Sequence, residues 1–209
     1  MTETLLIALT TFFATIGPLD VAAMFAALTT NNTARERRAM AVKASLIGGG
    51  ILLFFALFGK VVLESFGISL AALQASGGIL LLLIAIDMVF ARDSGSTSTT
   101  DQEQKEAEAK QDVSVFPLAT PLIAGPGAIG AAILLVSQAD GDTAEISLVI
   151  GALLAIILMT FLLMLLATQV QRLLGVTGLH VISRVVGVLL AGLAVQFIFD
   201  GIQNSGLLN

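Results

Sequence analysis

The sequence predicts an all-α membrane protein whose six transmembrane helices form two inverted-topology three-helix repeats, with helices one and four interrupted at Gly-Pro pairs. Of the 209 residues, 56% are hydrophobic and only 12% are charged, whereas a soluble domain carries about 25% charged residues. The apolar residues fall in six long blocks. With too few charges to cover a water-facing surface, the chain is predicted to lie in a lipid bilayer.

Six segments are long and apolar enough to span a bilayer, which takes about 20 residues of α-helix. Each carries few or no charges and is bounded by polar or Gly-rich residues. The first is interpreted as a retained helix, because it lacks the positively charged start of a signal peptide and is too long for one. The predicted spans are residues 4–28, 39–58, 70–91, 115–136, 146–167 and 181–202.

A polar stretch separates the third span from the fourth. It is rich in Ser, Thr, Asp, Glu, Gln and Lys, a composition typical of a solvated linker. The sequence therefore predicts a first three-helix repeat at 1–91, a polar cytoplasmic linker at 92–113 and a second three-helix repeat at 114–209.

The placement of Lys and Arg predicts the orientation, because these residues favour the cytoplasmic side. All of the 10 Lys and Arg residues except Lys60 lie in or beside the connections after spans one, three and five. Both termini are therefore predicted to lie outside the cytoplasm, in a multi-pass protein of the cell (inner or plasma) membrane.

The two halves of the chain resemble each other at an offset of 108 positions. Gly17-Pro18 lies inside the first span and Gly125-Pro126 inside the fourth, and residues 66–69 match 174–177 at the same offset. After a one-residue slip, residues 78–81 match 187–190. Because each three-helix repeat has an odd number of spans, the two repeats enter the membrane from opposite faces. Inverted repeats of this kind occur in many secondary transporters, which bind substrate near the bilayer midplane.

Each Gly-Pro pair is predicted to interrupt its helix. Proline removes a backbone hydrogen bond, and in lipid the freed groups must be buried in protein or line a wet cavity. Proline also suits the first turn of a new helix, whose unpaired amides carry about half a positive charge. Two such N-termini near the midplane predict a site for an anionic group such as a carboxylate. The structural alternative is a packing kink.

Three polar residues inside the spans are candidates for function. A carboxylate in the bilayer costs about 2.5–3.5 kcal/mol, so Asp20 is interpreted as a partner for a substrate ammonium group or a coupling proton. Alternatively, the dipole of the new helix favours an acid there. Asp87 is interpreted as snorkelling to the interface or relaying protons, and Gln196 as bonding between helices or lining a cavity.

The residue types present exclude several classes of site. The chain has no Cys and a single His, which excludes disulfides, thiol nucleophiles, thiolate-held metals and paired-His metal sites. No cofactor or metal is predicted, and the protein is not expected to be an enzyme. The predicted partners are a small-molecule substrate and the lipid bilayer, without nucleic acid, and a homo-oligomer is left open.

A proline-rich stretch in the fourth span carries a family resemblance. Residues 116–129 read FPLATPLIAGPGAI, and further similarity covers residues 17–20, 75–90 and 184–202 in both halves. On these residues the chain resembles the MarC family of six-span membrane proteins. In the first span it departs from the family pattern, with Gly17 where Asn or Asp is usual and Asp20 where a small residue is usual.

The resemblance implies a secondary active transporter of small neutral amino acids such as glycine and alanine, coupled to a proton or other cation gradient and working by alternating access. The alternative is a LysE-like exporter of another small metabolite or a cation. With the two breaks, this predicts the substrate-binding residues Gly17, Pro18, Leu19, Asp20, Thr120, Gly125, Pro126 and Gly127, and the coupling or cavity-lining residues Asp20, Asp87 and Gln196.

Overall fold

The computed structural model describes residues 2–29, 32–90, 112–139 and 141–206, and all regular structure in these ranges is helical. Five helical segments there are long and apolar enough to cross a membrane, and one bent helix pair is a sixth candidate. The predicted all-α membrane architecture is confirmed. The elements are α1 (Thr2–Ile16), α2 (Pro18–Leu28), α3 (Ala34–Ser65), α4 (Leu70–Phe90), η1 (Ser114–Ile123), α6 (Pro126–Gln138), α7 (Thr143–Leu165) and α8 (Ala167–Asn204).

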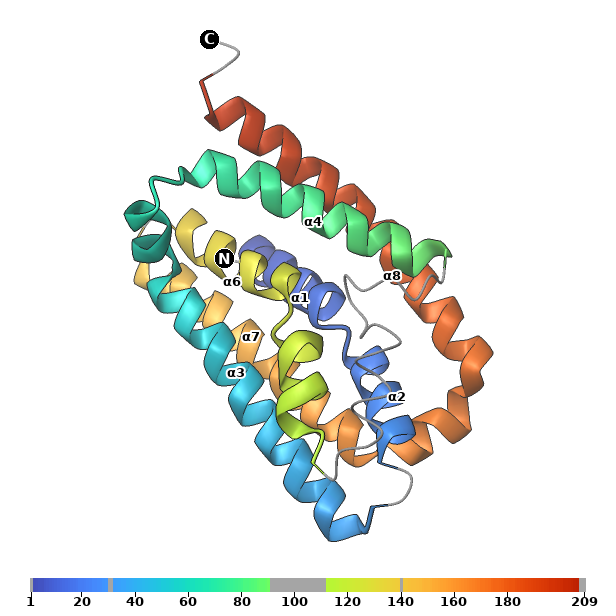
Figure 1. Ribbon diagram of the computed structural model, residues 1–209. Helices are drawn as coiled ribbons and strands as arrows, with labels where there is room; N and C mark the ends of the chain where they lie inside the picture. The colour runs from blue at the N-terminus through green and yellow to red at the C-terminus, as the bar shows by residue number, and fades with distance from the viewer. Residues whose placement is uncertain (1, 30–31, 91–111, 140, 207–209) are drawn as a thin grey trace.

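The helices form two groups in space. α4 and α8 lie side by side and antiparallel along one side of the molecule (Figure 1). In the other group, α3 packs against η1, α6 and α7, while α1 packs against α6 and α7. Figure 1 shows the first part of α8 curving before its second part runs beside α4. The two groups meet where α4 contacts α6 and α8 contacts α2.

Two helices extend beyond the spans predicted from hydropathy. The span predicted at 39–58 lies within α3, which begins at a capping box: the Thr33 side chain accepts from the Glu36 amide, and the Glu36 carboxylate accepts from the Thr33 amide at 2.8 Å. The span predicted at 181–202 lies within α8, and residues 168–180, predicted as a loop, are helical. Hydropathy marks only the lipid-facing part of a helix, whereas capping sets its ends. The linker predicted at 92–113 falls almost wholly on residues 91–111, outside the described residues.

The chain leaves the helical conformation between α1 and α2. Gly17 has φ 60° and ψ 61°, in the left-handed region that favours glycine. The Gly17 amide still donates to the Phe13 carbonyl, and the Val21 amide donates to the Gly17 carbonyl, both at 3.0 Å. The break is therefore short, and α1 with α2 forms one candidate span, Thr2–Ala26.

A wider irregularity precedes α6. Pro117 and Pro121 lie inside η1 and have no amide hydrogen to donate. The hydrogen bonds of this segment therefore reach five residues back, as from the Ala124 amide to the Ala119 carbonyl at 2.9 Å. η1 and α6 meet at an angle of 53°.

Glycines let α3 approach its neighbours closely. A Cβ atom added at Gly48 would lie 2.6 Å from Cγ2 of Ile123 on η1, and one at Gly49 would lie 3.4 Å from Cγ2 of Ile157 on α7. Small residues at such contacts are typical of helix packing in membranes, where close van der Waals contact replaces the hydrophobic effect. This packing holds η1 against the centre of α3.

The α4–α8 pair is packed in the same way. A Cβ atom added at Gly78 of α4 would lie 2.6 Å from the carbonyl oxygen of Ala194 on α8. One added at Gly187 of α8 would lie 3.1 Å from the carbonyl oxygen of Ala85 on α4. Each helix thus presents a glycine to the backbone of the other, and neither site has room for a side chain.

Candidate functional site

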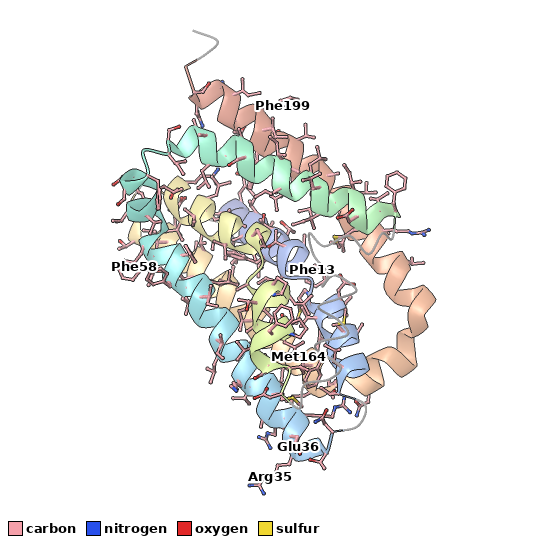
Figure 2. The ribbon with its side chains drawn as sticks, viewed as in Figure 1. Phe13, Arg35, Glu36, Phe58, Met164 and Phe199 are labelled. Atoms are coloured by element: carbon pink, nitrogen blue, oxygen red, sulfur yellow. The ribbon has the colours of Figure 1, made fainter. Side chains whose placement is uncertain are left out.

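The first break lines a small cavity that α4 and α8 help to close. Its volume is about 10 Å³, close to the minimum that holds one water molecule. Figure 2 labels Phe13 at the end of α1, next to this break. The lining residues are Phe13, Gly17, Pro18, Leu19, Asp20, Met88 and Val186. Four of the predicted site residues therefore share one cavity.

The carboxylate of Asp20 lies against the break itself. Asp20 is in the first turn of α2, and its Oδ2 atom lies 3.1 Å from the place that a Cβ atom on Gly17 would take. The side chain thus folds back toward the N-terminus of α2, where the helix dipole favours a negative charge. Asp20 is exposed, and the first break thus has a carboxyl group of its own.

The second break is closely packed. A Cβ atom added at Gly125 would lie 2.6 Å from the carbonyl oxygen of Pro121. One added at Gly127 would lie 2.5 Å from Cδ1 of Ile84 on α4. Both glycines are buried, so the backbone here is in direct contact with its neighbours and Ile84 covers the start of α6.

One stripe of α4 contacts both breaks. Ile84 lies over Gly127 at the second break, and Met88 lines the cavity at the first. Residues four apart lie on the same helix face, about 5–6 Å apart between Cβ atoms. The structure therefore brings the two predicted breaks together along α4, although they are 108 positions apart in the sequence.

The two breaks differ in charge. The first turn of α6 has no acidic residue, and Ala128 stands there where α2 has Asp20. Thr120, in η1, is half-buried, and its hydroxyl donates to the Val115 carbonyl at 3.2 Å. Pro126 is exposed. Of the two new helix starts, only that of α2 lies beside a carboxylate of its own first turn.

Two of the predicted coupling residues lie apart from the cavity lining. Asp87 is half-buried and precedes Met88 without itself lining the described cavity. Gln196 has an exposed side chain whose Nε2 atom donates to Oδ1 of Asp200 in the same helix at 2.8 Å. The arrangement groups Asp20 with the first break and leaves Gln196 on the outer side of α8.

Four residues at the breaks were not anticipated from the sequence: Phe13, Ile84, Met88 and Val186. All four are apolar side chains within long apolar blocks, so neither composition nor spacing distinguishes them from residues that face lipid. Only the packing of α4 and α8 against the breaks identifies them.

An ion pair connects α3 to the start of η1. Nζ of Lys43 lies 2.7 Å from Oδ2 of Asp112, and the side chains are 51% and 50% exposed. The hydrogen bonds from Lys43 and then from the Ser114 side chain and amide lower the pKa of Asp112 from 3.8 to about 2. These bonds stabilise the ionised carboxylate, so the pair holds η1 against α3 at neutral pH.

Replacing Asp112 with Asn is expected to lower thermal stability at pH 6 but not at pH 2. The folded-state pKa lies below the ordinary value, so the contribution is present above pH 3.8 and is lost as pH falls toward 2. Because the pair is half exposed, its contribution is at most about 1 kcal/mol. Unfolding midpoints of both proteins in detergent, measured between pH 6 and pH 2, check this; a difference that does not change with pH would contradict it.

Comparison with known proteins places the chain in a family. A family model described as MarC family integral membrane protein matches residues 2–205. A UPF0056 membrane protein of Methanocaldococcus jannaschii is 37% identical, with 96% of each chain covered. UPF0056 membrane protein YvbG of Bacillus subtilis is 36% identical over 91% of this chain and 90% of the relative. YhcE of Escherichia coli is 35% identical over 94% and 92%.

No solved structure matches the chain, so the relationship rests on sequence. The matched region includes both breaks and the α4 stripe that contacts them. The relatives are matched over almost their whole length. The chain belongs to the MarC family of integral membrane proteins.

Proposed function

We propose that this protein is a secondary active transporter of small neutral amino acids, of the size of glycine or alanine, that works by alternating access and is coupled to a proton or other cation gradient. One observation carries the proposal. Two helices, α2 and α6, begin at prolines within membrane-spanning segments, both starts contact the same stripe of α4, and only α2 has a carboxylate in its first turn.

This pair of helix starts matches the two charges of an amino acid. The first-turn amides of α6 have no partner in their own helix and carry partial positive charge, which suits the substrate carboxylate. Asp20 supplies the negative charge for the ammonium group. In the described conformation Ile84 covers the start of α6, and the cavity at the first break is close to the minimum that holds one water molecule. Substrate binding in the proposed mechanism therefore requires α4 to move away from both breaks, as alternating access implies.

The contacts between α4 and α8 support an inverted repeat. Gly78 contacts the carbonyl of Ala194, and Gly187 contacts the carbonyl of Ala85. Positions 78 and 187 are 109 residues apart, and so are positions 85 and 194. Each of the two contacts therefore becomes the other when every residue is replaced by its counterpart in the other half. Reciprocal contacts of this kind are expected when two copies are related by a pseudo-two-fold axis in the membrane plane.

The crossing of α3 and α7 supports the same symmetry. Gly49 lies against Ile157, and these residues are separated by 108 positions, the offset that relates the two Gly-Pro pairs. A residue contacts its own counterpart only close to a two-fold axis. The proposed axis therefore passes through this crossing, at the middle of α3.

The proposal includes an orientation in the membrane. Arg35, Arg37 and Arg38 lie at the N-terminal end of α3, and Lys60 lies near its other end. Since Lys and Arg favour the cytoplasmic side, we place the first group in the cytoplasm and both chain termini outside it, with the protein in the cell membrane.

Uptake by purified protein in liposomes tests the function. Labelled glycine and alanine are expected to accumulate, faster with an imposed inward proton gradient and not after an ionophore has dissipated it. A gradient of each cation replaces the proton gradient in parallel samples to identify the coupling ion. Correctly inserted protein that moves neither amino acid in either direction under any gradient would contradict the proposal, and movement of another metabolite or a cation instead would favour the exporter.

A further inference from the structure

A hollow on the outer side of α3 combines positive charge with an apolar surface. It is lined chiefly by Arg35, Arg38, Val42, Lys43 and Leu46, which we call the α3 stripe. Arg35, Arg38, Val42 and Leu46 recur every three or four residues and so lie along one helix face, with Lys43 beside them. Figure 2 shows Arg35 pointing away from the other helices at the end of α3.

Two cations of the stripe are available to a ligand. Arg35 and Arg38 are exposed, and neither forms an ion pair with a described residue. Lys43, by contrast, is paired with Asp112. Arg37, between the two, lies over the ring of Phe25, with its guanidinium carbon 5.6 Å from the ring centroid. Arginine fits phosphate through two parallel hydrogen bonds.

The apolar part of the stripe continues into the membrane-spanning region. Val42 is 39% exposed and Leu46 is 71% exposed. At 1.5 Å of rise per residue, Leu46 lies about 16 Å from Arg35 along the helix axis. That separation matches a phospholipid whose phosphate sits at the arginines and whose acyl chain follows the helix.

We propose that the α3 stripe binds an anionic phospholipid, with the phosphate at Arg35 and Arg38 and an acyl chain along Val42 and Leu46. A soluble anion would use only the arginines and leave the adjoining apolar surface uncovered. A zwitterionic lipid would cover that surface but would bring no net negative charge to two cations that form no ion pair with a described residue. An anionic lipid satisfies both parts of the stripe.

The composition of the chain allows a direct measurement. The protein has no Trp and no Tyr, so Leu46→Trp introduces a single fluorophore at an exposed position. In vesicles, its fluorescence is quenched by lipids with brominated acyl chains. Brominated phosphatidylglycerol is expected to compete for this position about thirtyfold better than brominated phosphatidylcholine. Each of the two arginines contributes a factor of about five, and the factors multiply.

Two controls locate the effect. Phe58→Trp places the fluorophore on the same helix near its other end, at a side chain that is 53% exposed, and is expected to show no preference between the two lipids. In the Leu46→Trp protein, R35Q/R38Q is expected to remove the preference. R37Q/K60Q, which removes the same number of charges from α3 outside the stripe, is expected to keep it.

Three results would overturn the proposal: equal quenching by both lipids at position 46, a preference that survives R35Q/R38Q, or a preference of the same size at position 58. Each Trp variant is first checked for a single symmetric peak on size-exclusion chromatography. If Leu46→Trp does not fold, Val42→Trp takes its place in the same experiment, because Val42 lies on the same stripe.

Discussion

Asp20→Asn is expected to lower glycine uptake by about tenfold to a hundredfold, because a hydrogen bond between charged groups is worth about 1.5–3 kcal/mol. In the proposed mechanism the Asp20 carboxylate faces the substrate ammonium group, and Asn keeps its size but not its charge. The helix should still form, since Asn is tolerated near helix starts. The remaining uptake is expected to lose its stimulation by a proton gradient, because Asn cannot exchange a proton.

Initial rates in proteoliposomes, with protein amount and orientation matched, provide the measurement. Asp112→Asn is the matched control: it makes the same chemical change at an exposed ion pair, and it should keep uptake within about twofold because such pairs contribute little. Full uptake in Asp20→Asn would reject the role assigned to this carboxylate. Equal losses in both variants would instead indicate a general effect on folding or insertion.

Gly78→Ala is expected to lower the free energy of unfolding by about 2 kcal/mol, the typical cost of overpacking a core. The added Cβ would lie 2.6 Å from the Ala194 carbonyl oxygen and 2.9 Å from the amide nitrogen of Ile198. Both are backbone atoms, so no side-chain rotation relieves the clash and α4 must move away from α8. Thermal or denaturant unfolding in detergent, followed by circular dichroism, measures the change.

The neighbouring glycine provides the matched control. A Cβ atom added at Gly77 would meet no atom within 4 Å, so Gly77→Ala should be neutral or should stabilise the helix by up to about 1 kcal/mol through its propensity. Equal destabilisation by the two substitutions would show that the loss comes from glycine content rather than from the contact between α4 and α8.

The sequence identifies the elements of this fold better than their contacts. Apolar blocks locate the spans because a bilayer requires about 20 apolar residues from each helix. They miss the polar start of α3, where Thr33 and Glu36 form the cap, and they miss the first part of α8, which is too polar for a hydropathy criterion. Helix ends depend on capping and propensity, which hydropathy does not measure.

The candidate site was predictable only in part. Gly-Pro pairs point to both breaks because proline has the same backbone chemistry in any context. The role of α4 was not predictable, since Ile84 and Met88 resemble every other apolar residue of their span. Gln196 was chosen for its polarity inside a span, but its amide bonds to Asp200 on the same helix. Partners in space decide such roles, and a single sequence does not contain them.

The paired glycines of α4 and α8 also restrict how the chain length can vary during evolution. Adding one residue inside either helix would turn everything beyond it by about 100°. Gly78 or Gly187 would then face lipid, and a side chain would meet the opposing carbonyl. Insertions and deletions should therefore concentrate in the segments that connect these helices to the rest of the chain, where a change of length leaves the register of the pair intact.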